Sequence, residues 1–300
     1  MGKEERELKL SFISKKEYGC PVCNESFRKE ELFSGGGRLI AGALTEELHR
    51  LFEPSAKYGD VYPLAYHVVV CPSCWFASTE EDFGLFPKGR RDLAFSDKNR
   101  RKTDTLLVFP DTDFTKPRGL MEGAASMYLA LRCYDFYGKE ASPTIKRGIT
   151  ALRTAWLLDE LHKKFPDQNY DWLAVLFRKK AQYFYTEALA REQKGTETMS
   201  AIKNYGPDFD KNYSYEGMLY LCAYLSLNYG PPANSQEEQK TALEEARRTI
   251  AKLFGMGKKS KDRPGAFLDQ ARKVYNSINA KLEELKAEMK AAEGKPQEPG

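Results

Sequence analysis

Two Cys-Pro-x-Cys pairs constrain this 300-residue chain more than any other feature of its sequence. Two residues between the cysteines of a pair let both sulfurs point at one ion, while backbone amides of the tight turn hydrogen-bond the thiolates. Two such pairs supply the four thiolates that a structural zinc ion prefers. The sequence therefore predicts one structural zinc ion held by Cys20, Cys23, Cys71 and Cys74.

Other uses of these cysteines stay open at the level of sequence. A redox site needs only one pair, in a βαβ context; a [4Fe–4S] cluster also takes four cysteines; disulfides are a third option. His49 and His67 are alternative ligands, although four cysteines suffice. Four thiolates leave no open position for water, which argues against catalytic zinc. Cys133 and Cys222 have the spacing of buried core thiols.

Composition indicates a soluble protein. Hydrophobic residues make up 41% of the chain and charged residues 30%, and no apolar run is long enough to cross a membrane. Residues 1–12 lack the apolar stretch and cleavage site of a secretory signal. We therefore expect a cytoplasmic location without a membrane partner. In that compartment, paired cysteines favour metal over disulfide.

The net charge of +4 is too small to require a nucleic-acid partner, but the charge is unevenly distributed. Residues 88–102 read KGRRDLAFSDKNRRK. Their cations would meet phosphates and Phe95 would stack on a base if the segment bound nucleic acid. A solvated basic loop is the alternative interpretation. The candidate nucleic-acid contacts are Arg90, Arg91, Arg100, Arg101 and Lys102.

The cysteine pairs and this basic linker define a predicted N-terminal module over residues 1–118. We expect short strands at 8–13, 66–70 and 106–109, and a short helix at 45–52 with Thr45 as its N-cap. The sequence GGGR at 35–38 lacks the lysine and the flanking strand of a phosphate-binding loop, so it indicates a hairpin tip. With no dinucleotide fingerprint and no HExxH motif, we expect neither enzymatic activity nor a small-molecule substrate.

After residue 118, apolar residues recur at helical spacing, and Gly or Pro residues separate most of these helical stretches. Helices are predicted at 119–137, 142–164, 169–193, 212–229, 236–254 and 264–292. The fold class is therefore mainly α: a small N-terminal zinc-ribbon-like β module followed by TPR-like α-helical hairpins over 119–292. Residues 293–300 contain nothing that forms a core and should be a disordered tail.

The aromatic residues of the helices suggest where a protein partner would bind. Most tyrosines at helical spacing belong to a core, but some should line a groove, where aromatic side chains anchor partners. The candidate groove residues are Tyr183, Tyr185, Tyr213 and Tyr215. We expect the last helix to pack back on its neighbours rather than pair between chains.

Three stretches resemble the bacterial family named DUF2225, a domain of unknown function: CPVCNESF at 20–27, YPLAYHVVVCPSCWFAS at 62–78 and ALRTAWLL at 151–158. The resemblance extends from Cys20 to Asn279 and implies a TPR-like C-terminal half. One position departs from it, because the family usually has Gly where this chain has Trp75. Glycine would relax a positive φ in the turn, so Trp75 predicts a different turn or an exposed aromatic contact.

These patterns together predict a non-enzymatic, zinc-containing protein-interaction scaffold or adaptor. The zinc module would cap or extend a helical array whose concave face binds a protein. The alternative is a nucleic-acid-binding zinc-ribbon protein that uses residues 88–102.

Overall fold

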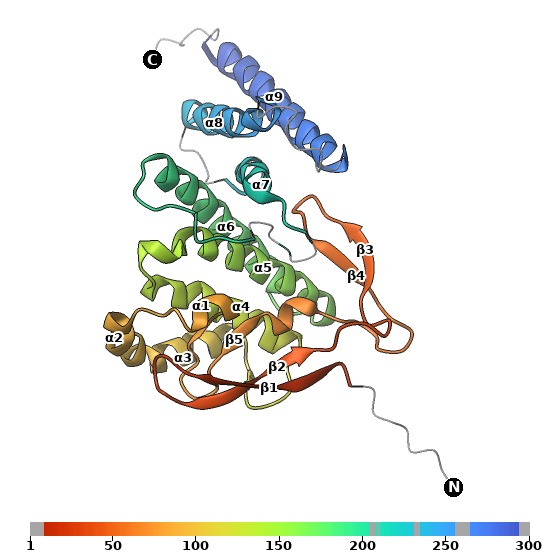
Figure 1. The fold of residues 1–300 in the computed structure, drawn as a ribbon. Coiled ribbons are helices and arrows are strands. Elements are labelled where there is room, and N and C mark those ends of the chain that lie inside the picture. The colour runs from red at the N-terminus through yellow and green to blue at the C-terminus, as the bar shows by residue number, and fades with distance from the viewer. Residues whose placement is uncertain (1–8, 205–207, 209–210, 231–234, 256–264, 294–300) are drawn as a thin grey trace. The chain divides into compact units, whose positions relative to one another are not determined.

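The computed structural model describes residues 9–204, 208, 211–230, 235–255 and 265–293, and most of them are helical (Figure 1). Contacts divide the chain into two compact units. The first runs to Thr45 and resumes over His49–Lys203; the second contains Glu46–Leu48 and the chain from Asn204 onward. The domain boundary expected at residue 118 rests on the change from a cysteine-containing, basic sequence to one with helical spacing. It stays a prediction. The predicted tail lies outside the described residues, except for Glu293.

Three two-stranded antiparallel sheets form the N-terminal part of the first unit. They pair β1 (Ser11–Gly19) with β2 (Ser26–Leu32), β3 (Ile40–Leu44) with β4 (Arg50–Glu53), and β5 (Val68–Val70) with β6 (Ala77–Thr79). Gly19 faces Ser26 in the first hairpin, and Val70 faces Ala77 in the third. Each of these two hairpins is therefore closed by a loop of the same length, and each loop contains one cysteine pair. A short 3-10 helix, η1 (Pro63–Tyr66), precedes β5.

The helix predicted at 45–52 is wrong, because this stretch closes the β3–β4 hairpin. The amide of Thr45 donates to the carbonyl of His49, and the amide of His49 donates to the Thr45 hydroxyl. Thr45 thus uses its side chain to close a turn rather than to cap a helix.

The segment expected to be a basic linker with a strand is helical. It contains α1 (Glu80–Phe83), η2 (Lys88–Arg90), α2 (Arg91–Ser96) and α3 (Lys98–Val108). The strand predicted at 106–109 is wrong: these residues end α3, where the Phe109 amide still donates to the carbonyl of Thr105. Short apolar runs do not distinguish a strand from the end of a helix. Here the buried side chains of Arg101 and Thr105, one turn apart, decide the outcome.

Three longer helices complete the first unit: α4 (Leu120–Cys133), α5 (Pro143–Lys164) and α6 (Tyr170–Gln193). Successive helices pack on each other, and α4 also packs on η1, β5 and β6 (Figure 1). Short 3-10 turns, η3 (Tyr134–Phe136) and η4 (Lys139–Ala141), connect α4 to α5. The boundaries of α4, α5 and α6 lie close to the predicted ones, since Gly138, Pro143 and Pro166 interrupt the helical pattern.

The second unit contains α7 (Ser214–Tyr229), α8 (Gln236–Gly255) and α9 (Gly265–Glu293). Helix α9 packs on both α7 and α8, which confirms that the last helix packs back within its own chain. Its buried stripe consists of Phe267, Ala271, Val274, Ile278, Leu282 and Leu285. The mainly α fold with a small β module is confirmed, whereas the TPR-like character of the hairpins stays a prediction. Among the described helices, none combines the length and apolar character needed to cross a membrane.

We predict that Gly123→Ala destabilises the protein. Alanine normally stabilises a helix interior by about 1 kcal/mol over glycine. Here a Cβ on Gly123 would lie 2.6 Å from the Cβ of Ala65 and 2.8 Å from its Cα. Forcing α4 away from η1 costs about 1–3 kcal/mol, so we expect a net loss of about 1 kcal/mol by urea unfolding. Gly255→Ala is the control, because nothing lies within 4 Å of its added Cβ; equal stability of both variants would contradict the close approach.

Candidate metal centre

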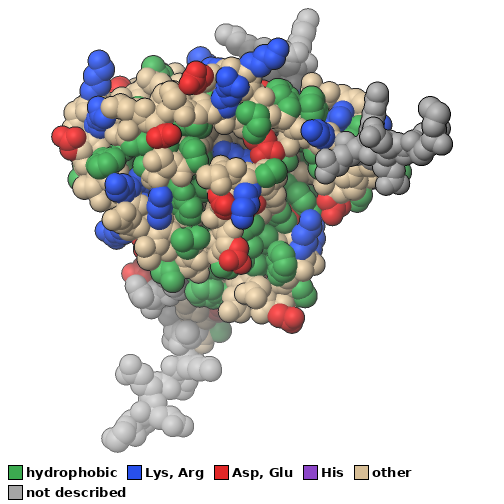
Figure 2. Space-filling model, turned by 90° about the horizontal axis from the view of Figure 1, so that it is seen from below, with side chains coloured by type: hydrophobic (Ala, Val, Ile, Leu, Met, Phe, Trp, Pro, Cys, Tyr) green, Lys and Arg blue, Asp and Glu red, His purple; other side chains and the backbone are tan. Residues whose placement is uncertain are grey.

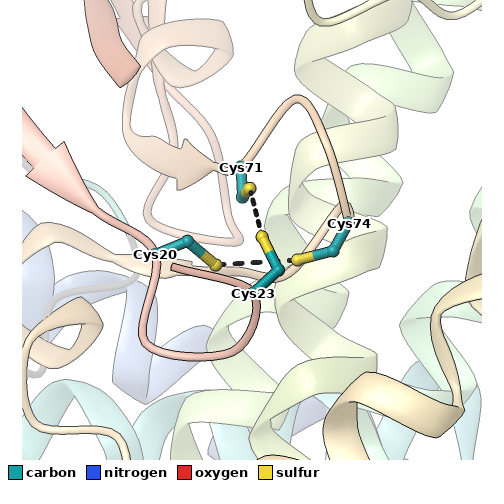
Figure 3. Close-up of side chains that lie close together, drawn as sticks. All are labelled: Cys20, Cys23, Cys71 and Cys74. Atoms are coloured by element: carbon teal, nitrogen blue, oxygen red, sulfur yellow. Dashed lines mark hydrogen bonds between the residues drawn. The ribbon is translucent and has the colours of Figure 1, made fainter. Parts of the chain in front are cut away.

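The four cysteines converge from two hairpin loops to a single point (Figure 3). All four sulfurs lie within 4.8 Å of one another, with 3.6 Å between Cys20 and Cys74 and 3.5 Å between Cys23 and Cys71. A regular tetrahedron of sulfurs about 2.3 Å from a central ion has edges of about 3.8 Å. All four thiols are free, and their separations far exceed the S–S bond length of about 2.05 Å. The cluster therefore has the dimensions of a four-thiolate metal site.

Both loops have the same backbone hydrogen bonds. We call residues 20–25 the first knuckle and residues 71–76 the second knuckle. In the first knuckle, the Asn24 amide donates to the Cys20 carbonyl and the Cys20 amide to the Glu25 carbonyl. In the second knuckle, the Trp75 amide donates to the Cys71 carbonyl, and the Cys71 amide donates to the Phe76 carbonyl. Equal spacing, a proline after the first cysteine and flanking strands thus produce the same turn twice.

Trp75 has the backbone conformation in which a glycine was expected. Its φ is +58°, and its counterpart Asn24 has a φ of +64°. The prediction of a different turn or an exposed aromatic contact is therefore wrong. The Trp75 side chain is only 8% exposed; its ring meets the edge of Phe114 at a centroid distance of 5.2 Å, and Lys102 Nζ lies 5.7 Å from the ring centroid. Burial of the indole offsets the strain of the left-handed conformation.

Hydrogen bonds link the thiols in pairs, Cys20 with Cys74 and Cys23 with Cys71. Cys20, Cys71 and Cys74 are buried, and Cys23 is half-buried. Hydrogen bonding with Cys71 and Cys74, together with burial, raises the pKa of Cys20. Hydrogen bonding from Cys20 and Cys71 lowers the pKa of Cys74. A cation among the sulfurs would favour the thiolate form of all four, because it attracts each negative charge.

The buried guanidinium of Arg101 holds the second knuckle. Its Nη2 donates to the Cys74 carbonyl at 2.8 Å, and its Nε donates to the Trp75 carbonyl at 3.2 Å. Its Nη1 donates to the Ala94 carbonyl and to Asp97, each at 3.1 Å. On the other knuckle, Arg91 Nε donates to the Val22 carbonyl at 3.0 Å. Sequence reasoning missed this role, because it read the basic segment as an exposed surface.

The five candidate nucleic-acid contacts do not form one surface. Arg90 and Arg100 are exposed, Arg91 and Lys102 are half-buried, and Arg101 is 0% exposed and thus unavailable to a phosphate. Arg100 also pairs with Asp104 at 3.6 Å. On the face in Figure 2, positive and negative side chains are interspersed with hydrophobic ones rather than gathered by sign. Arg101 is therefore excluded as a phosphate contact, and nucleic-acid binding through the other four residues stays a prediction.

Neither alternative histidine ligand belongs to the cysteine cluster. Burial, with a smaller contribution from nearby Arg153, lowers the pKa of His67 well below its usual value. The His49 ring stacks on Trp156, with centroids 4.1 Å apart. Cys133 and Cys222 are buried, as predicted for core thiols. Cys133 also supports the third hairpin, since its sulfur accepts a hydrogen bond of 3.4 Å from the Ala77 amide.

The four tyrosines proposed as a partner groove have different environments. Tyr183 on α6 is 58% exposed, but Tyr185 is fully buried. In the second unit, Tyr213 is buried and Tyr215 is half-buried. Exposed apolar residues that sequence reasoning missed are Trp172, which is 60% exposed, and Val175. Spacings of three and eight residues from Trp172 through Val175 to Tyr183 place all three on one face of α6.

We predict that glycine destabilises one of the two matching left-handed positions and leaves the other nearly unchanged. Trp75→Gly relieves about 1–2 kcal/mol of backbone strain but removes a buried tryptophan, which typically costs about 3–5 kcal/mol. The expected net loss is about 2–3 kcal/mol. Asn24→Gly should change stability by less than about 0.5 kcal/mol, because Asn24 is exposed and asparagine tolerates this conformation. Denaturant unfolding of both variants checks this; a stabilised Trp75→Gly protein would show that strain outweighs burial.

Comparisons with known proteins agree with this organisation. The sequence profile of DUF2225, described as an uncharacterized protein conserved in bacteria, matches residues 13–278. An uncharacterized protein of Borreliella burgdorferi is 38% identical over 278 residues, which cover 93% of this chain and 99% of that protein. No solved structure matches. The matched range includes both knuckles and the helices α1 to α8, so the chain belongs to the DUF2225 family.

Proposed function

We propose that this protein is a non-enzymatic interaction scaffold whose N-terminal part is held together by one structural zinc ion. The observation that carries the metal assignment is the convergence of four sulfurs from two matching knuckles. A four-thiolate shell is closed, so the ion would neither bind nor activate a substrate. Its chemistry would be structural: it would tie the two hairpin loops together.

A single zinc ion fits this donor set better than an iron–sulfur cluster. Four thiolates in tetrahedral array select zinc or iron among the metals that proteins use. An iron–sulfur cluster holds its cysteine sulfurs around several iron atoms, so they lie farther apart than around one ion. Distances of 3.5 Å and 3.6 Å between sulfur pairs favour a single ion. Because six thiols are free, we also propose a cytoplasmic location, where thiols stay reduced.

The surface of α6 supports the scaffold part of the proposal. Trp172, Val175 and Tyr183 are exposed along one face, whereas the opposite face packs inward through Ala174, Phe177, Ala181, Tyr185 and Ala188. Aromatic side chains are the residues that most often anchor protein partners. An exposed apolar row on a rigid helix therefore favours a protein partner over a small molecule. We propose this row, called the α6 row below, as the partner-binding surface.

We expect about one zinc per chain when the protein is purified without a metal-affinity step and analysed by mass spectrometry. Cys71→Ser/Cys74→Ser should lose the zinc and unfold the N-terminal hairpins, since structural zinc contributes on the order of 10 kcal/mol to folding in small peptides. Acidification should release the ion, because protons compete for the thiolates.

Cys222→Ala is the matched control, because Cys222 is buried but lies outside the cluster. It should keep one zinc per chain. Protein that contains no metal, or iron with a visible chromophore, would contradict the zinc site.

We expect a photo-crosslinking residue in place of Tyr183 to capture a protein in nuclease-treated lysate of the cell that makes this chain. Trp172→Ala should abolish that capture without changing the fold, because it removes the largest exposed side chain of the α6 row. Leu107→Ala is the control: Leu107 is 79% exposed but lies on α3.

The protein-interaction scaffold and the nucleic-acid-binding protein give distinct results in this experiment. Capture that is seen only in a parallel lysate without nuclease treatment would favour the nucleic-acid function. Capture that is insensitive to Trp172→Ala, or no capture, would contradict the role of the α6 row.

A further inference from the structure

Arg101 is the largest side chain that is fully buried among the described residues. A buried guanidinium is costly unless its donors are satisfied and its charge is balanced. Four of the five N–H donors of Arg101 have acceptors: the carbonyls of Cys74, Trp75 and Ala94 and one carboxylate oxygen of Asp97. Two of these acceptors belong to the second knuckle, so the cation lies directly against the backbone of the metal site.

The charge of the loaded site gives a reason for this position. A divalent ion with four thiolates carries two net negative charges. Three of its ligands are buried, so water screens this charge only weakly and a nearby fixed cation is favourable. Asp97 offsets part of the charge of Arg101, but Asp97 is itself partly exposed and lies 3.9 Å from Arg132.

Arg91 contacts the first knuckle, where it donates to the carbonyl of Val22, the residue before Cys23. Both arginines come from one short segment, α2–α3, which spans residues 91–108. Two cations from this segment therefore contact the backbones of the two knuckles, one each.

We propose that Arg101, together with Arg91, couples metal binding to the docking of α2–α3. The arginines hold the knuckle carbonyls in the geometry that the bound metal needs and offset the negative charge of the thiolates. In return, the loaded site provides the negative charge that keeps the two arginines docked. Such coupling is reciprocal: the segment raises metal affinity, and metal binding orders the segment. This proposal rests on the proposed metal site and assigns Arg101 as its positioning residue.

Lysine cannot replace Arg101 in this role. The guanidinium uses three nitrogens, fixed in one plane, to contact four acceptors on three different segments. An ammonium group keeps the charge but offers one point of contact. Arg101→Lys therefore separates charge from geometry, and Arg101→Met removes both.

The test measures metal affinity by competition with a chromophoric zinc chelator. Loss of a group that orients metal ligands typically lowers affinity 10–100-fold. We expect a loss of at least about tenfold for Arg101→Met and a smaller loss for Arg101→Lys. Arg100→Met is the matched control on the same helix, since Arg100 is 78% exposed; its affinity should equal that of the wild type. The Co²⁺-loaded variants should show an altered thiolate charge-transfer spectrum if knuckle geometry has changed.

Limited trypsin digestion of the wild type measures the reverse effect, the ordering of α2–α3 by bound metal. Chelation of the metal should accelerate cleavage after Arg90, Lys98 and Arg100 well before cleavage after Lys179 on α6. Wild-type affinity and spectrum in Arg101→Met, or equal digestion of α2–α3 with and without metal, would overturn the proposal. If Arg101→Met does not fold, Arg91→Met provides the same comparison, because Arg91 makes one hydrogen bond at a half-buried position. A wild type without metal would instead refute the metal site itself.

Discussion

Four sulfurs at one point determine how the N-terminal part of the first unit is held together. Its hairpins have only two strands each, and β5 and β6 have three residues apiece. Two-stranded hairpins of this size are marginal by themselves. The sulfur cluster joins the loops of the first and third hairpins, which lie far apart in sequence, so one ion would constrain all the chain between residues 23 and 71.

The helical body holds the third hairpin from the other side. Cys133 on α4 accepts from the Ala77 amide, and the Tyr134 hydroxyl donates to Asp82 at 2.8 Å. Lys146 on α5 donates to the same carboxylate at 2.7 Å. Both Arg101 and residues of α4 thus hold the second knuckle or the strand that follows it. The cysteine cluster is therefore tied to the helix packing of the first unit.

Sequence patterns predicted the parts of this structure that depend on local chemistry. The CPxC spacing predicted which four cysteines converge, and apolar periodicity with Gly and Pro breaks located α4 to α9 within a few residues. The errors arose where long-range contacts decide. Arg101 looked like a surface cation, because nothing local shows that its acceptors are carbonyls of residues 74, 75 and 94. Likewise, burial of the Trp75 ring outweighs a local preference for glycine, and helical spacing alone did not separate exposed Tyr183 from buried Tyr185.

The half-exposed position of Cys23 makes one side of the cysteine cluster more accessible to solutes than the other. The other three sulfurs belong to buried residues, so an oxidant, an alkylating reagent or a competing chelator dissolved in water meets Cys23 first. Ligand exchange at a loaded site would begin at its most accessible sulfur and proceed inward only after that bond had opened. The first knuckle would thus be the kinetic entrance to the proposed metal site, and the second knuckle, whose two cysteines are buried, would be the end that retains the ion longest.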